Sequence, residues 1–175
     1  MNMVINKKAV SEIVGTVIVI AIVIGIGTIT WVVVNNFVKQ QTEEAGSCIE
    51  IIDKVSLEGR YTCYNITSRE LQFSINIGDI DVDEILVGIS GQGKGISFTI
   101  KKQPEFVQNV VMYPDRDPNV KLPERNAGLT YLFNFSSAGF TEVPDSIKIS
   151  PSIKKNRCGV VDSINEIENC ALIVQ

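Results

Sequence analysis

Four cysteines are the residues of this chain whose side chains could form covalent links or bind a metal: Cys48, Cys63, Cys158 and Cys170. A zinc site would need unusual ligand spacing, because the sequence has no Cys-x-x-Cys pair and no histidine. Reduced, buried thiols in a cytosolic protein are one alternative. In an exported domain, four cysteines permit three disulfide connectivities. Because the cysteines lie in two separate neighbourhoods of the sequence, we expect the pairs Cys48–Cys63 and Cys158–Cys170.

A glycine-rich segment, Gly88 to Gly95, matches G-x-x-x-x-G-K, the first seven letters of a phosphate-binding P-loop. The eighth letter should be Ser or Thr to hold Mg²⁺, but it is Gly95. The next residues, ISFTI, are typical of a strand rather than of the helix that a P-loop needs. We therefore expect a hairpin connection.

An acidic segment resembles the start of a calcium-binding loop through Asp79, Asp81, Asp83 and Glu84. An EF-hand is excluded, because Glu84 stands where that loop requires glycine and Ser90 where it requires glutamate. We expect a solvated acidic edge, with a looser calcium site between loops as the alternative.

Two sequons for N-glycosylation begin at Asn65 and Asn134. Export makes modification plausible, and we favour Asn65 over Asn134 because Asn134 lies in a strand-like stretch. Catalytic arrangements that use histidine as a base are excluded by composition, since the chain has no histidine. We therefore expect a protein without catalytic residues, cofactor or metal.

An apolar segment near the N-terminus dominates the organisation of the chain. Ile13 to Val34 is a run of 22 residues without a charge. As a helix it would be about 33 Å long, close to the roughly 30 Å of a bilayer's hydrocarbon core. The apolar region of a secretory signal usually has about 7–15 residues, so this run predicts a retained membrane span. Lys7 and Lys8 precede the span, which predicts a cytoplasmic N-terminus and an external domain after residue 40.

The remainder predicts an α+β protein, in which one long N-terminal helix precedes an antiparallel β-sandwich with two disulfides. We expect the helix over Ala9 to Glu44, with a stop at Gly46. Beyond it, alternating apolar residues and turn signals predict seven strands, at 48–56, 59–66, 70–77, 84–90, 95–102, 129–135 and 146–153. The segment 163–169 is expected to be a short helix or a loop held by Cys170. The predicted regions are therefore 1–8, 9–45 and 46–175.

The segment from Lys7 to Gly15, KKAVSEIVG, followed at once by the apolar helix, resembles the processing motif of archaeal type IV pilins and pilin-like proteins, which are related to archaellins. This resemblance implies cleavage between Lys8 and Ala9 by a membrane-embedded prepilin peptidase. It covers about the first 40 residues. It also implies a pilus assembly ATPase and a membrane platform as partners, and a filament that this chain builds with copies of itself.

In such a filament the helix would leave lipid and pack against its copies. The residues expected at those contacts are Ala9, Glu12, Gly15, Ala21 and Gly25. Ala21 and Gly25 form a small-xxx-small pair, which permits close approach of helices. Glu12 would be the fourth residue after cleavage. It either pairs with the new amino terminus of a neighbour or lies as a carboxylate near the positive end of its own helix.

The charge balance opposes nucleic-acid binding, because the trimmed chain would carry 14 basic and 20 acidic side chains, a net charge of −6. The predicted function is a structural filament subunit, with adhesion or surface contact through the β-domain. Before assembly the protein would be a single-pass membrane protein, and afterwards part of a filament on the cell surface. The alternatives are a permanently anchored monomer that binds a partner outside the cell, and a minor subunit of a pilus made by other chains.

Overall fold

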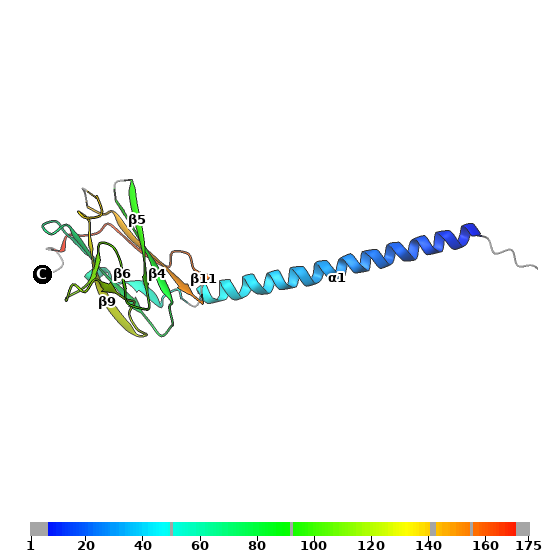
Figure 1. Ribbon diagram of the computed structural model, residues 1–175, viewed down its shortest axis with the longest axis horizontal. Coiled ribbons are helices and arrows are strands. Elements are labelled where there is room, and N and C mark those ends of the chain that lie inside the picture. Colours follow the sequence, from blue (N-terminus) through cyan, green and yellow to red (C-terminus); the bar gives the residue numbers. More distant parts are fainter. Residues whose placement is uncertain (1–6, 50, 92, 141–142, 155, 171–175) are drawn as a thin grey trace, which may run out of the picture. The chain divides into compact units, whose positions relative to one another are not determined.

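The chain is described by a computed structural model that covers residues 7–49, 51–91, 93–140, 143–154 and 156–170 (Figure 1). Within the helix, the side chains of residues 7–13 and 40–47 lie outside this description. The chain divides into two compact units, residues 1–45 and 46–175, which we describe separately.

Helix α1 runs from Lys7 to Ile49 and has 43 residues. The predicted helix was shorter, and the predicted stop at Gly46 is wrong. A glycine inside a helix costs only about 1 kcal/mol relative to alanine, so it weakens a helix without ending it. The last turn belongs to the second unit, where Cys48 is covalently linked and Ile51, the first described residue after the helix, is fully buried. The predicted strand 48–56 is therefore wrong at residues 48–49, which are helix, and at residues 51–54, which form a turn.

The first sheet of the second unit is centred on β3 (Glu70–Ile77) and β9 (Ala127–Asn134), which pair antiparallel over their whole length. On the other side of β3 lie two short strands, β1 (Val55–Leu57) and β2 (Cys63–Asn65). A single 3-10 turn, η1 (Gly59–Tyr61), separates them. Strand β7 (Val110–Met112) completes this sheet on the far side of β9.

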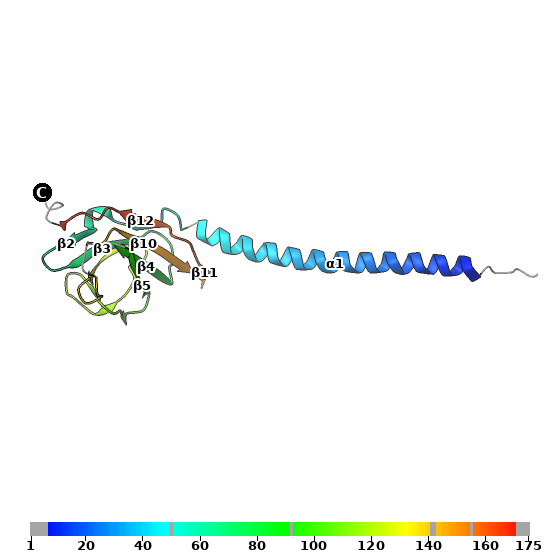
Figure 2. The same ribbon diagram turned by 90° about the horizontal axis from the view of Figure 1, so that it is seen from above.

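The second sheet is centred on β10 (Ser146–Ile153) and β4 (Glu84–Gly91), with β5 (Lys94–Lys101) beyond β4 (Figure 2). The free side of β10 again pairs with two short strands, β11 (Asn156–Arg157) and β12 (Asp162–Asn165). A separate two-stranded ribbon consists of β6 (Glu105–Phe106) and β8 (Asn119–Val120). Each sheet thus has one edge that consists of two successive short strands.

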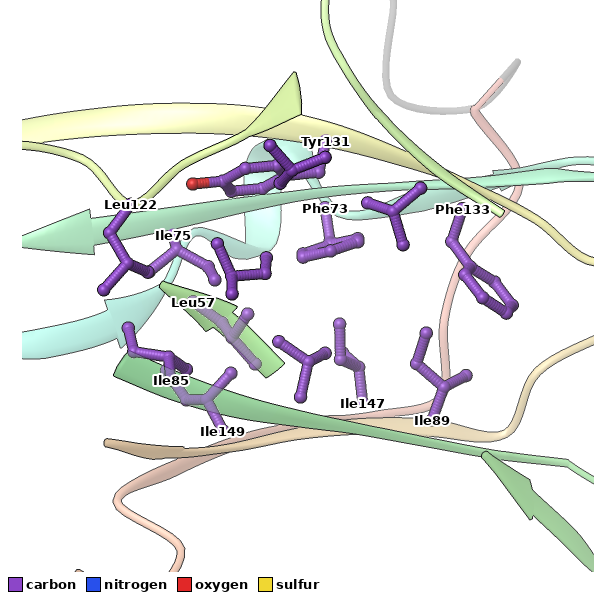
Figure 3. Packing of buried hydrophobic residues seen from close by; sticks show 14 of the residues in the cluster. Leu57, Phe73, Ile75, Ile85, Ile89, Leu122, Tyr131, Phe133, Ile147 and Ile149 are labelled. Atoms are coloured by element: carbon purple, nitrogen blue, oxygen red, sulfur yellow. The ribbon is translucent and has the colours of Figure 1, made fainter. Parts of the chain in front are cut away.

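The hydrophobic core lies between the two sheets, and Figure 3 shows their side chains facing one another. Phe73 and Tyr131 of the first sheet stack with ring centroids 5.2 Å apart, and both are fully buried. Ile85, Ile89, Ile147 and Ile149 of the second sheet lie opposite them and are also buried. The period-two pattern that predicted a sandwich is therefore the pattern of burial, as in β4, where every second side chain is buried.

The prediction of an α+β protein with a long apolar helix, antiparallel sheets and two disulfides is confirmed. The five long strands, β3, β4, β5, β9 and β10, agree with their predicted ranges within two residues. The predicted strand 59–66 is only half strand, because its first part forms η1. The predicted helix or loop at 163–169 is wrong in its first half, where residues pair with β10 as β12.

The predicted disulfide pairing is wrong. The structure links Cys48 to Cys158 and Cys63 to Cys170, with S–S distances of 2.04 and 2.12 Å. The reason is that each pair of sequence neighbours is separated by strands that run along a sheet edge. Strand β1 and η1 lie between Cys48 and Cys63, and β12 lies between Cys158 and Cys170. Each cysteine therefore meets a partner that is distant in sequence, Cys158 after β11 for Cys48 in the last turn of α1, and Cys170 after β12 for Cys63 in β2.

Candidate functional site

The apolar part of α1 is the feature of this chain that most needs a partner. Val14–Lys39, a segment of 26 residues whose most apolar 18-residue window has a mean hydropathy of 2.8, is long and apolar enough to cross a membrane, and no side chain of that window is buried. Ile29 is 66% exposed and Trp31 is 68% exposed. A Val or Ile side chain contributes about 1.5–3 kcal/mol when it leaves water. This surface is therefore suited to lipid or to other apolar helices.

Two threonines of this segment have hydroxyl groups that are compatible with an apolar surrounding. Thr28 donates its hydroxyl hydrogen to the carbonyl of Gly25, and Thr30 donates to the carbonyl of Ile26, both at 2.8 Å. Because a hydroxyl without a partner is costly away from water, these local bonds remove a penalty that lipid or helix packing would impose.

The small residues expected at filament contacts leave open positions along α1. A Cβ atom added at Gly15, Gly25 or Gly27 would meet no atom within 4 Å, outside its neighbours and its own helix backbone. Ala21 is exposed. The side chains of Ala9 and Glu12 lie outside the described residues, so their expected contacts stay predictions.

The expected cleavage bond between Lys8 and Ala9 lies in the first turn of α1, which begins at Lys7. The first four amide groups of a helix have no partner within the helix, so this turn is the least costly part to unwind into a protease. The side chains of Lys8 and Ala9 lie outside the described part of the chain, and cleavage there stays a prediction.

The four cysteines form two crosslinks, one from the last turn of α1 to the segment after β11 and one from β2 to the segment after β12. Cys63 begins β2, and its partner Cys170 follows Asn169, which pairs with Tyr64 in a parallel bridge. Between the two disulfides, the Leu57 amide donates to the Asp162 carboxylate at 2.8 Å. The sandwich is thus closed here by covalent and hydrogen bonds, a structural role rather than a chemical one.

The glycine-rich segment forms the β4–β5 hairpin, as predicted, with Gly91 paired to Lys94. Gly93 has a φ of +74°, which the turn requires and which glycine adopts without strain. Gln92 lies outside the described residues. The P-loop resemblance therefore has no structural counterpart.

The acidic segment carries ion pairs. Asp81 accepts hydrogen bonds from Arg125 and from Lys102, the latter at 3.2 Å, and Asp79 lies 3.7 Å from Arg125. The Arg125 hydrogen bond, followed by that of Lys102, lowers the pKa of Asp81 to about 2. Among the described residues, no three His, Cys, Asp or Glu side chains are grouped closely enough to hold a metal ion.

The two sequon asparagines differ in their surroundings. Asn65 is exposed at the end of β2, and its side-chain oxygen accepts hydrogen bonds from the amides of Thr67 and Ser68. Asn134 is the half-buried last residue of β9, and its side-chain oxygen accepts a bond from the Ser137 amide. Glycosylation at either asparagine stays a prediction.

A cleft that the sequence did not predict lies beside β6, β7 and the end of β9. Phe106, Glu70, Arg116, Asn109 and Asn134 are among its lining residues. Arg116 forms two parallel hydrogen bonds of 2.9 Å with Glu70, and this contact lowers the pKa of the Glu70 carboxyl. Glu70 and Arg116 are 46 residues apart and have no common motif, so no local signal in the sequence could have found the pair.

No known protein family, curated protein or solved structure shows a match to this chain.

Proposed function

We propose that this chain is a subunit of an extracellular filament of the type IV pilus kind. It is inserted in the cytoplasmic membrane through α1, trimmed between Lys8 and Ala9, and then assembled through the same helix. The β-domain is displayed outside the filament core and makes surface contacts.

The observation that carries this proposal is the exposed apolar segment Val14–Lys39 in the same chain as a domain with two disulfides. Disulfides form and persist in oxidising compartments, which supports an external β-domain. Lysines before the span support a cytoplasmic N-terminus. A segment with this hydropathy must be covered, first by lipid and then by copies of itself.

Helix contacts rather than hydrophobicity would have to drive assembly out of the membrane, because lipid covers Val and Ile as well as protein does. Association of apolar helices therefore depends on close packing at small residues. The open surface at Ala21 and Gly25 supplies such a place, and the bonded hydroxyl of Thr28 lies one turn further along.

The processing step is tested by the mass of the protein recovered from its native host. We expect a mature chain that begins at Ala9. Lys8→Gln should increase the fraction of untrimmed chain, whereas the control Lys39→Gln, on the far side of the span, should be trimmed normally. Recovery of intact Met1 to Lys8 from a protein confined to the membrane would instead identify a permanently anchored monomer.

The assembly step is tested by shearing cells and imaging the released filaments by electron microscopy. Gly25→Leu should still insert in the membrane but should not be recovered in filaments, because leucine prevents close approach. Ile24→Leu conserves volume at the adjacent position and should assemble normally. If Gly25→Leu assembled as well as Ile24→Leu, the proposed contact surface would be wrong. Labelling of this chain only at filament tips would identify a minor subunit.

A further inference from the structure

The cleft at β6, β7 and β9 has the size and composition of a pocket for a small ligand. Its volume is about 230 Å³. Pockets for drug-sized molecules measure roughly 300–1,000 Å³, so this one is suited to a single ring. Its floor is apolar, because Val107, Val110 and Leu132 line it and are buried. Its rim is polar, which restricts ligands to molecules with both kinds of surface.

Phe106 supplies an exposed aromatic ring at the cleft. It is 72% exposed, more than any other large hydrophobic side chain that the structure describes. Strand β6 holds it through pairing with β8, where Phe106 lies opposite Asn119. An exposed ring on a paired strand is a costly arrangement for stability alone, since its apolar face stays in water. It is a suitable platform for the apolar face of a ligand.

Glu70 and Arg116 determine the electrostatics of the cleft. The two side chains neutralise one another through a bidentate contact, so the cleft does not favour a charged ligand. A guanidinium has five N–H donors and a carboxylate has about four acceptor positions, so the pair retains capacity for further bonds. Arg116, with a backbone φ of 57°, is fixed in its loop by this contact, which holds the polar rim in place before a ligand arrives.

The amide side chains of Asn109 and Asn134 add donors and acceptors to the same cleft. They are held together through the backbone, because the Asn134 amide donates to the Asn109 carbonyl at 2.8 Å. The cleft therefore combines an aromatic face, neutral polar groups and an ion pair that is already satisfied. These groups complement a molecule with one apolar face, several hydroxyls and no net charge.

We propose that this cleft binds one neutral sugar ring of an external oligosaccharide. The C–H face of the ring packs on Phe106, and its hydroxyls bond with Arg116, Glu70 and the two asparagines. A single ring with few bonds would be held weakly, with a dissociation constant on the order of 1 mM. The site does not depend on filament formation, although display on a filament would raise its avidity.

The test uses the full chain in detergent micelles and a panel of immobilised neutral, sialylated and sulfated oligosaccharides, followed by NMR titration with the neutral oligosaccharide that binds best. Intact-mass analysis first establishes whether Asn134 is modified. We expect binding to neutral members of the panel. Phe106→Ala should weaken that binding at least 10-fold. Arg116→Lys should also weaken this binding, because lysine keeps the charge but lacks the planar guanidinium that donates two parallel hydrogen bonds.

The control is Val160→Ala, which removes another exposed apolar side chain of the β-domain and should bind as the original chain does. Because Phe106 is exposed, its substitution should leave circular dichroism and thermal unfolding unchanged. The proposal is overturned if no neutral oligosaccharide binds, if only acidic ones bind, or if Phe106→Ala binds normally. It is also overturned if Asn134 carries a glycan that occupies the cleft, or if Phe106→Ala abolishes filaments and leaves sugar binding intact.

Discussion

The two units of this chain satisfy the same physical requirement in opposite ways. The β-domain buries its apolar side chains against one another, so that Phe73, Ile85 and Ile147 are all fully buried. In α1 the apolar side chains from Val14 onward remain about half exposed or more. The β-domain can therefore be stable by itself, whereas α1 needs a bilayer or other helices. Substitutions in the first unit should affect assembly, and substitutions in the second should affect stability.

The disulfides give the largest expected effect on the stability of the β-domain. Each closes a long loop, with sequence separations of 110 and 107 residues. On the chain-entropy model the first crosslink contributes about 4–5 kcal/mol. Once the Cys48–Cys158 bond exists, the chain between Cys63 and Cys170 is connected by a shorter route that runs through this bond. The second disulfide therefore closes a loop of only about 30 residues and contributes about 3–4 kcal/mol. Since whole domains are stable by about 5–15 kcal/mol, replacing all four cysteines by serine should leave the domain largely unfolded.

This prediction is measured by urea unfolding of the full chain in detergent, with circular dichroism as the readout. Cys63→Ser/Cys170→Ser alone should retain a folded domain with a lower urea midpoint, and helicity from α1 should persist in every variant. Non-reducing peptide mapping that linked Cys48 to Cys63 would contradict the structural basis of the prediction. Equal midpoints for the oxidised and cysteine-free chains would contradict its magnitude.

The second prediction compares one core side chain with one helix side chain. Phe73→Ala removes a fully buried ring and should lower the free energy of unfolding by about 3–5 kcal/mol. Ile22→Ala removes a side chain that is 54% exposed in α1, so the urea midpoint of the β-domain should not change. Filament yield should show the reverse order, with Ile22→Ala the more defective among chains that are still folded. A lower urea midpoint for Ile22→Ala would show that α1 and the β-domain unfold together.

The sequence predicted the features whose signals are local. The uncharged run from Ile13 to Val34 predicted a long apolar helix, although not its end, and the alternation of Leu71, Phe73 and Ile75 predicted β3 with the bounds that the structure shows. The disulfide pairing was not predictable in this way, because it depends on which sheet edges meet. Proximity in sequence suggested the wrong partners, since a short strand carries Cys63 away from Cys48. The cleft was missed for the same reason, as Glu70 and Arg116 meet only through the pairing of distant strands.

The third prediction compares hydroxyl groups in the two units. In the β-domain, Ser74 and Thr130 share a hydrogen bond of 2.7 Å between β3 and β9, and Ser74 is 4% exposed. Ser74→Ala should cost about 0.5–1.5 kcal/mol, because the hydrogen bond with the partly buried Thr130 hydroxyl is lost. Ser74→Ala/Thr130→Val removes both groups and should be nearly neutral. Thr28→Val is the matched change in α1 and should not affect unfolding, since the hydroxyl of Thr28 bonds with the Gly25 carbonyl of its own helix.

These variants are compared by urea unfolding as a double-mutant cycle. A double variant as unstable as Ser74→Ala would show that packing, and not the hydroxyl, accounts for the loss. Conversely, a destabilised Thr28→Val would indicate that the span contributes to the folding of the β-domain.

The smallest expected effect is a pH dependence at the surface of the β-domain, where Asp81 contacts Lys102 and Arg125. Arg125 first, then Lys102, lowers the pKa of Asp81 from 3.8 to about 2. Because the folded-state pKa lies below the unfolded value, the contribution is complete above about pH 4 and is lost as the pH falls through about 2. The stability of Asp81→Asn should therefore fall less steeply between pH 4 and pH 2 than that of the original chain.

The matched control is Asp115→Asn, at an exposed aspartate for which the described part of the chain shows no ion pair, and it should keep the original slope. High salt should weaken the difference, because ions screen exposed charge pairs. The same pH series should leave the helicity of the part of α1 from Val14 to Val38 unchanged, since this part has no ionisable side chain. If Asp81→Asn and Asp115→Asn lost stability equally steeply between pH 4 and pH 2, the contacts of Asp81 would contribute nothing measurable to the stability of the fold.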